Sequence, residues 1–388
     1  MRAAFLLLSL LATCTASNTV ASPPGRSPDD WPVHTAEQAG LNADALAAVI
    51  GRISRESSNI HAVLVEREGY LVAELYRTGE DRVLARRYGV LSTTTEFGPD
   101  TLHDVRSISK SVISLLYGMA MERGKAPLLE SPVSASLPGL KGLDNAGVIQ
   151  IRHLLTMSTG LAWDEIGHGD LTSDEFRLFW KADRLDYVFD RPLANTPGTT
   201  FNYNGGATVA LAEILSDAAH RSFVDIAADD LFRPLGITQW EWATDFRGRP
   251  LPFGGLRLRP RDMLKIGRLI LNRGRWNNRQ LVPAEWIDAS IQTHKKTGLH
   301  FFTGAGQEAG YGFQWWTGTT ILPGRQIGWA AAIGNGGQRI TVIPELNMTV
   351  VVTAGDYGSP EIQTTVARLI DEIIVATLRP PSSMELSR

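Results

Sequence analysis

Two serines and a lysine stand at the head of a predicted helix in the segment HDVRSISKSVISLL, residues 103–116. Ser107 and Lys110 are three residues apart, so on a helix they would share a face of the first turn. A serine hydroxyl is a weak nucleophile that needs a nearby base. A lysine can be that base when burial or a neighbouring cation lowers its pKa. Alternatively, Ser107 caps the helix and Lys110 reaches solvent, which is the commoner role for so short a motif.

The helix itself is predicted from Ile108, Val112, Leu115 and Met119, which recur at helical spacing and would form a buried stripe. Ser107 is the only serine in the chain that has a lysine three residues on. The free N–H groups of a helix start can stabilise an oxyanion that develops beside it. Nucleophilic catalysis is therefore a hypothesis that requires partner residues elsewhere in the chain.

The first candidate partner is Tyr203, in the segment FNYNGG at residues 201–206, directly before a predicted helix at 207–218. A phenolate stabilised by Lys110 could take the proton from Ser107. The alternative is a half-buried tyrosine that anchors a turn.

A second candidate lies near the C-terminus, where GNGGQ at residues 334–338 stands between two predicted strands. Glycines among strand residues indicate that a ligand or another backbone approaches closely, or that the chain makes a tight turn. A literal Lys-Thr-Gly at 296–298 matches a box known from serine enzymes. We reject it, because it lies in a polar, glycine-bearing segment without an alternating strand around it.

The elements that must position these residues follow from hydrophobic periodicity. Helices are predicted at 43–53, 151–157, 207–218, 260–272, 283–292 and 361–378, and strands at 62–66, 70–76, 327–333, 338–343 and 348–353. Strands at both ends around a helical middle predict an α/β (α+β) fold, with one antiparallel sheet built from both termini and flanked by helices. We assign 40–124 and 256–388 to this α/β domain and 125–255 to a mostly helical domain.

The N-terminal residues predict export. One basic residue and an apolar run from Ala3 to Ala12 are typical of a signal peptide and too short to cross a bilayer. We assign residues 1–21 to the signal peptide, with cleavage after Ala21, and 22–39 to an N-terminal arm. Cleavage is favoured over lipidation at Cys14, the chain's only cysteine. A periplasmic or secreted protein without disulfides is expected, with no stable membrane span.

Composition narrows the classes of partner. The chain has 388 residues, 43% hydrophobic, and a formal net charge of −3 without a basic stripe, which argues against nucleic acid. The eight histidines are scattered, and no H-E-x-x-H motif or glycine-rich phosphate loop is present. We therefore expect no metal and no cofactor, and a small molecule as the substrate of a monomer or homodimer.

With these three elements in this order, the chain resembles the serine hydrolases of the β-lactamase (class C) and DD-peptidase superfamily, in their esterase and 6-aminohexanoate-oligomer hydrolase branch. Supporting segments are IQIRHLLTMSTGL at 149–161, LNRGRWNNRQLVPAEW at 271–286, YGFQWW at 311–316 and GNGGQRITVIPEL at 334–346. The S-x-x-K and K-T-G boxes are those of penicillin-recognising enzymes.

The resemblance implies a role for each box. Ser107 would be the acylated nucleophile, Lys110 its activator and Tyr203 the general base and then acid. The backbone N–H groups of Ser107 and Gln338 would form the oxyanion hole. Substrate would contact the remaining predicted residues, which are Asn335, Gly336, Gly337, Gly205, Trp163 and Trp315.

Two residues depart from the family pattern. Gly205 stands where a Tyr-x-Asn box has its asparagine, and Asn335 stands where the strand box has a cationic Lys or His. Both changes favour an ester or a linear amide over a β-lactam as substrate. The alternatives are a class C-like β-lactamase or DD-peptidase acting on β-lactams or cell-wall peptides, and a non-catalytic binding module on the same fold.

Overall fold

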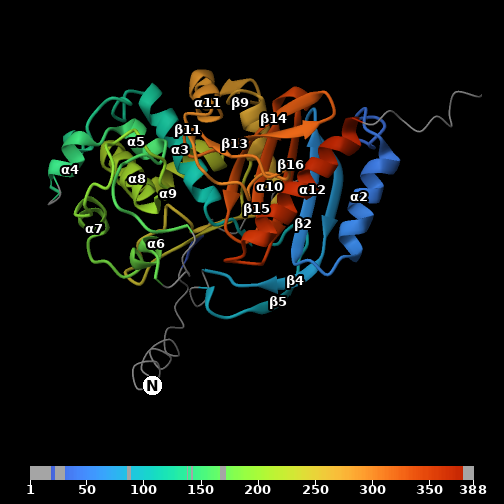
Figure 1. Cartoon of the computed structure of the whole chain (residues 1–388), viewed down its shortest axis with the longest axis horizontal. Coiled ribbons are helices and arrows are strands. Elements are labelled where there is room, and N and C mark those ends of the chain that lie inside the picture. Colours follow the sequence, from blue (N-terminus) through green and yellow to red (C-terminus); the bar gives the residue numbers. More distant parts are fainter. Residues whose placement is uncertain are drawn as a thin grey trace, which may run out of the picture.

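The computed structural model describes residues 19–21, 31–84, 89–137, 139–140, 143–166 and 172–378. The chain folds into a helical part and a sheet part that lie side by side (Figure 1). Most of the predicted signal peptide, including Cys14, lies outside the described residues. Among the helices that are described, none combines the length and the apolar character needed to cross a membrane.

The sheet part is built around eight antiparallel strands in the order β11-β12-β13-β14-β15-β16-β2-β3. Pairing of β16 with β2 joins the C-terminal strands to the N-terminal hairpin, as the sequence predicted. The strands are β2 (Ile60–Arg67), β3 (Tyr70–Tyr76), β11 (Lys295–Lys296), β12 (Gly310–Tyr311), β13 (Trp316–Leu322), β14 (Arg325–Gly334), β15 (Gln338–Ile343) and β16 (Met348–Ala354). The β2–β3 turn has positive φ at both Glu68 and Gly69, the geometry that suits the twist of a hairpin.

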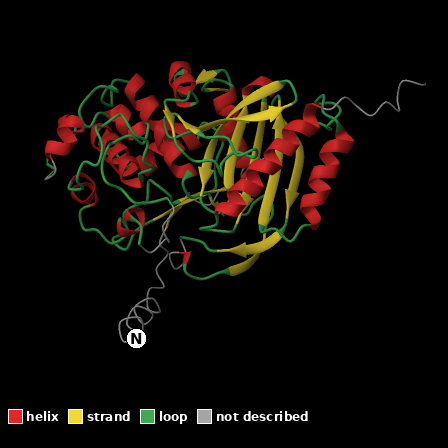
Figure 2. Ribbon diagram, in the orientation of Figure 1, coloured by secondary structure: helices red, strands yellow, loops and turns green. Residues whose placement is uncertain are grey.

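Helices cover both faces of this sheet (Figure 2). Helices α2 (Ala43–Arg55) and α12 (Pro360–Leu378) pack against each other on one face, and Asn42 caps α2 by accepting a hydrogen bond from the Ala45 N–H at 2.9 Å. On the other face lie α10 (Pro260–Leu271), against β15 and β16, and α3 (Ile108–Glu122), against β14 and β15. Because both faces are covered, β15 and β16 are buried along their whole length.

The helical part is centred on α8 (Gly205–Ala219), which packs against α3, α5 and α7. Helix α3 is buried from Ile108 to Ala120, so it is a central helix rather than an amphipathic surface one. Helix α11 (Ala284–Ser290) contacts α3 from the sheet side. The other elements of the helical part are η2 (Val133–Ala135), α4 (Leu143–Val148), α5 (Ile151–Leu155), α6 (Asp174–Arg177), α7 (Arg184–Phe189), α9 (Phe223–Ile226) and η3 (Ala227–Phe232).

Small sheets connect the two parts. A four-stranded sheet has the order β1-β7-β8-β6, with β1 (Thr19–Ala21), β6 (His103–Asp104), β7 (Trp240–Ala243) and β8 (Leu256–Leu258). Strand β6 ends three residues before Ser107, so this sheet helps to fix the start of α3. Two further pairs are β4 (Thr78–Asp81) with β5 (Thr93–Glu96), and β9 (Arg275–Trp276) with β10 (Arg279–Gln280).

Thr19–Ala21, the end of the predicted signal peptide, forms strand β1 and pairs with β7. One segment differs from the sequence predictions. Lys296, predicted in a loop without strand structure, belongs to the two-residue strand β11 at the edge of the large sheet. A two-residue strand pairs through its backbone and needs no hydrophobic alternation, which is why the pattern did not predict it.

Candidate active site

Ser107 is presented by a strained turn at the start of α3. The preceding residue, Arg106, has a φ of 51°, in the left-handed region that a long side chain rarely adopts. Its guanidinium donates to the carbonyl of Arg82 at 2.6 Å and lies over the ring of Tyr357, while its carbonyl accepts from Ser109 Oγ at 2.6 Å. The Ser107 side chain makes no capping bond to the helix, so its hydroxyl is free of that role.

Lys110 points inward rather than toward solvent, and its side chain is 1% exposed. Its Nζ donates to Ser107 Oγ at 3.0 Å, to Glu175 Oε2 at 2.7 Å and to the carbonyl oxygen of Phe253 at 2.9 Å. The Nζ also lies 3.5 Å from Glu165 Oε1. The alternative in which Ser107 caps the helix and Lys110 reaches solvent is therefore excluded.

Tyr203 completes the cluster from the segment that precedes α8. Asn204 caps α8 by accepting from the Ala207 N–H at 3.1 Å, which fixes the residue before it. The Lys110 ammonium lies 4.9 Å from the centre of the Tyr203 ring. A hydrogen bond with Ser107 acts to lower the pKa of Tyr203, but burial outweighs it and raises that pKa to about 12. The phenol is therefore neutral in the resting site.

The charge state of Lys110 differs from the one that sequence reasoning required. Burial by itself would lower the lysine pKa, but Glu175, Tyr203 and Glu165 together raise it above its ordinary value. Lys110 is therefore an ammonium in the resting site. Before it can accept a proton from Ser107, it must give one away.

Two glutamates that the sequence did not assign to the site surround Lys110. Glu165 is buried, and its Oε2 accepts from the Trp163 indole N–H at 2.8 Å and from the Gly205 N–H at 2.6 Å. Burial first, and then the nearby Glu175, raise the pKa of Glu165 well above its ordinary value, so this carboxyl holds a proton. The side chain of Glu175, on α6, is 25% exposed at the cleft. The sequence signal for both is weak, since single glutamates are common.

These side chains open into a cleft of about 470 Å³ between the helical part and the sheet. Its polar lining residues are Ser107, Glu165, Ser173, Glu175, Asn335, Ser359 and Gln363. Its larger aromatic and aliphatic lining residues are Ile166, Tyr203, Phe301, Phe302, Trp316 and Ile333. No Lys, Arg or His is among the described residues that line this cleft.

Comparisons with known proteins agree with this geometry. The Beta-lactamase family model matches residues 63–373. The chain belongs to the beta-lactamase family. It is 25% identical over 337 residues to the 6-aminohexanoate-dimer hydrolase of Paenarthrobacter ureafaciens, covering 83% of this chain and 79% of that protein.

Solved structures show the same fold. A Bacillus anthracis protein provisionally named 6-aminohexanoate-dimer hydrolase superposes with a TM-score of 0.69 at 19% identity, covering 95% of this chain and 93% of its own. The hydrolase EstCE1, described as having promiscuous acyltransferase activity, gives a TM-score of 0.62 at 18% identity, covering 88% and 99%. The protein is thus a serine hydrolase of the beta-lactamase family, related to 6-aminohexanoate-dimer hydrolase.

In this beta-lactamase-family hydrolase the strand box is a hairpin turn. Asn335, Gly336 and Gly337 connect the paired residues Gly334 and Gln338 of β14 and β15. Asn335 lines the cleft, whereas Gly336, Gly337 and Gln338 are absent from its described lining. The Asn335 side chain accepts from the Gly358 N–H at 2.7 Å, and the Gln338 side chain bonds to the backbone of Ala354.

The backbone of β14 approaches α3 closely at the floor of the cleft. A Cβ atom at Gly334 would collide with the carbonyl oxygen of Val105, two residues before the nucleophile. At Gly336 it would meet the Tyr357 ring at 2.6 Å. These contacts explain the glycines of this segment as sites of close backbone approach.

The predicted tryptophans lie beside the cleft rather than in its wall. Trp163 is 6% exposed and orients Glu165, whereas Trp315 is fully buried. The next residue, Trp316, lines the cleft and packs against Tyr203 with ring centres 5.5 Å apart. Adjacent residues of an extended chain point to opposite faces, so of two adjacent tryptophans only one faces the cleft. Sequence alone does not say which.

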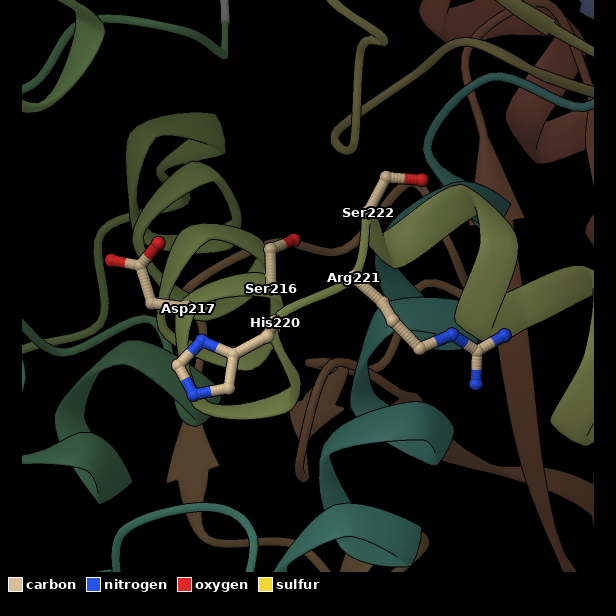
Figure 3. Close-up of a pocket in the computed structure, with 5 residues that line it drawn as sticks. All are labelled: Ser216, Asp217, His220, Arg221 and Ser222. Carbon is tan, nitrogen blue, oxygen red and sulfur yellow. The ribbon is translucent and has the colours of Figure 1, made fainter.

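A second hollow lies at the C-terminal end of α8 (Figure 3). It is lined by Ser216, Asp217, His220, Arg221 and Ser222, whose side chains point in different directions. Ser216 Oγ is engaged with the Ala212 carbonyl at 2.8 Å and the Phe223 N–H at 3.0 Å. No nucleophile and base meet among these five described residues. Within the described ranges, no group of three or more His, Cys, Asp or Glu residues could hold a metal ion.

Proposed function

We propose that this hydrolase cleaves esters or linear amides through an acyl-enzyme on Ser107. The observation that carries the proposal is the 3.0 Å hydrogen bond between Lys110 Nζ and Ser107 Oγ, at the floor of an open cleft that Tyr203 also lines. A nucleophile within hydrogen-bond reach of its activator is the arrangement that covalent catalysis requires. Water would then release the acyl group from Ser107.

Tyr203 is proposed as the proton carrier between Ser107 and the leaving group. Its hydroxyl is neutral in the resting site, because burial raises its pKa to about 12. It can therefore protonate the leaving group as the acyl-enzyme forms, and the phenolate left behind would be stabilised by the nearby Lys110 ammonium.

The oxyanion hole is proposed to combine the N–H of Ser107, at the start of α3, with an N–H from the β14–β15 hairpin. The family resemblance favours Gln338 as this second donor. The lining of the cleft favours Asn335, because Asn335 borders the space beside Ser107 while Gln338 is paired with Gly334 in the ladder. We therefore prefer Asn335 and keep Gln338 as the alternative.

Substrate class is inferred from charge and shape. A β-lactam carries a carboxylate, and no Lys, Arg or His is among the described residues that line the cleft. The aromatic residues Phe301, Phe302 and Trp316 instead offer an apolar surface to an acyl chain. The name of the Paenarthrobacter relative, 6-aminohexanoate-dimer hydrolase, supports a linear amide.

Three substrates assayed side by side test this proposal: p-nitrophenyl butyrate, the linear dimer of 6-aminohexanoate and nitrocefin. We expect turnover of the ester, the amide or both, and labelling by a fluorophosphonate probe that Ser107→Ala abolishes. Ser114→Ala is the matched control, because Ser114 lies on the same helix with a buried hydroxyl that has no partner. Rapid nitrocefin turnover without ester or amide hydrolysis would identify the β-lactam alternative. A folded wild type that never labels would indicate the binding module.

A periplasmic or secreted location is also proposed, from the character of residues 1–21. Cleavage after Ala21 would remove strand β1, which ends at that residue. N-terminal sequencing of the exported protein tests this directly, with Ser22 expected as the first residue. Light scattering of the same sample distinguishes the monomer from the homodimer.

A further inference from the structure

The asparagine of the family box is missing at Gly205, and the space beside this glycine is filled by the two glutamates. A Cβ atom at Gly205 would lie 2.6 Å from Glu175 Oε2 and 3.3 Å from Glu165 Oε2. No larger residue fits at position 205 while the glutamates stay in place. The glycine is therefore matched to the carboxyl groups, and both groups contact Lys110.

We propose that Glu165 and Glu175 form a positioning pair that shares one proton and serves as the acceptor that neutralises Lys110 before Ser107 attacks. This inference rests on the proposed acyl-enzyme function and deepens it. In the family box the asparagine side chain would contact the lysine, and here the two glutamates take over that contact with Lys110.

The pair is held together by structure outside the cleft. The segment that carries Glu165 and the helix that carries Glu175 are joined by two hydrogen bonds: Asp174 N–H to the Asp164 carbonyl at 2.7 Å, and Asp164 N–H to Asp174 Oδ2 at 2.9 Å. Trp163 and the Gly205 N–H then fix one oxygen of Glu165, so its other oxygen faces Lys110.

Geometry and burial favour one proton on this pair. Both carboxyl groups contact Lys110 Nζ, and burial together with Glu175 raises the pKa of Glu165 well above its ordinary value. Among the described residues, the titratable groups that act on the pair come from three other elements: Lys110 on α3, Tyr203 before α8 and Tyr311 on β12. Glu175 Oε2 accepts from Lys110 Nζ at 2.7 Å, so this oxygen is placed to receive the lysine proton.

The proton transfers balance through one acylation. Lys110 gives a proton to Glu175 and becomes neutral, and the Ser107 proton then moves to Lys110 as the Oγ–carbonyl bond forms. When the bond to the leaving group breaks, Tyr203 protonates that group. Lys110 reprotonates Tyr203, and Glu175 returns its proton to Lys110. Ser107 has then lost one proton, the leaving group has gained one, and every other group is restored.

The test measures the rate of fluorophosphonate labelling of the full-length protein between pH 5 and 10, with kcat and KM for p-nitrophenyl butyrate. In Glu175→Gln, we expect the labelling rate and kcat to fall about 10- to 100-fold near neutral pH, within the usual worth of one proton-transfer group. We expect the acidic limb of the pH profile to move upward by about one pH unit or more, because Lys110 must then lose its proton to solvent. Glu165→Gln replaces a carboxyl that already holds a proton by a neutral amide, so its effect should be smaller than that of Glu175→Gln.

Two further variants distinguish a specific effect on Lys110 from a general disturbance of the structure. Glu74→Gln is the matched control. Glu74 lies on strand β3 and is paired with Arg261 on α10, and its side chain is 22% exposed, close to the 25% of Glu175. It should leave the rate and its pH profile unchanged. In Glu175→Ala combined with Gly205→Asn, the new amide fits into the vacated space, and we expect a recovery of about tenfold or more over Glu175→Ala alone.

The inference is overturned if Glu175→Gln keeps the wild-type pH profile, if its effect is confined to KM, or if the asparagine double variant recovers nothing. Each of these results leaves the proposed function standing, provided that Ser107 is still labelled. Wild-type protein that is not labelled at Ser107 would instead overturn the proposed function itself.

Discussion

For a single side chain such as Lys110, the sequence predicts its position but not its charge state. Its spacing from Ser107 correctly predicts that the two share a face, and they meet at 3.0 Å. The charge of the lysine, however, depends on Glu165 and Glu175, which lie 55 and 65 positions away in the sequence. Burial lowers a lysine pKa and carboxylates raise it, so no local pattern decides which effect is larger.

Tyr203→Phe is predicted to remove catalysis and keep the fold. Only the hydroxyl is lost, while the ring keeps its contacts with Trp316 and Tyr311. We expect kcat for the best substrate to fall by about 10²- to 10⁴-fold, with an unchanged melting temperature. Tyr70→Phe, on the distant β2–β3 hairpin, serves as the control. If the Tyr203→Phe variant were as active as the wild type, Tyr203 would have no part in the mechanism.

At the scale of the element, the sequence predicted most of the long helices and the inner strands, because these carry regular apolar spacing. Strand β6 and the short helix α6 are different. Helix α6, for example, is held by the bonds between Asp164 and Asp174. The element that places Glu175 in the site is therefore one that periodicity does not predict.

The close packing of α3 against α11 predicts that Gly118→Ala lowers the free energy of unfolding. A methyl group at Gly118 would overlap the Trp286 ring, so Gly118→Ala should destabilise the protein by about 1–3 kcal/mol. Gly147→Ala is the matched control, since it is also helical and its nearest neighbour is 4.0 Å away, at Ser134 Oγ. That variant should be neutral or stabilising by up to about 1 kcal/mol. Urea unfolding measures both changes, and equal effects would contradict the packing argument.

The stack of His61, on β2, against Phe97 predicts that the protein loses stability in acid. His61 lies against Phe97 with ring centres 3.9 Å apart, and burial lowers its pKa to about 4. Between pH 6.5 and 4 the unfolded chain binds more protons than the folded one at this residue, so stability falls as pH falls. The shift corresponds to about 3 kcal/mol.

His61→Phe keeps the stack and removes this titration, so we expect a flatter fall in the free energy of unfolding between pH 6.5 and 4. Some slope should remain, because burial also lowers the pKa of His103. The control is His220→Asn, at the exposed C-terminal end of α8, which should leave the slope unchanged. An unaltered slope in His61→Phe would contradict the assignment.

At the scale of the whole molecule, pairing of β16 with β2 joins the two ends of the chain in one sheet. We predict that amide hydrogen exchange is slowest in β15, β16 and β2, which are buried and paired on both sides. The edge strands β3 and β11 should exchange faster. Exchange followed by mass spectrometry measures this order, and fast exchange in β16 would show that the sheet does not form one cooperative unit.

The three boxes are Ser107 to Lys110, then Tyr203, then the β14–β15 turn. Their order, together with the supporting segments, predicted the family, and hydrophobic periodicity predicted the general architecture. Neither predicted which neighbours face the cleft, as Trp315 and Trp316 illustrate. That choice depends on how the helical part meets the sheet, which is a property of the completed fold.

Gly334 has a consequence for how such an enzyme can diversify. Its backbone rests against the carbonyl of Val105, so any substitution there would push the nucleophile's own segment out of place. We therefore expect new substrate ranges to arise at other residues that line the cleft, such as Ile166, which is 37% exposed and has room to change size. Natural or laboratory evolution of specificity should accumulate its changes there and leave the floor untouched.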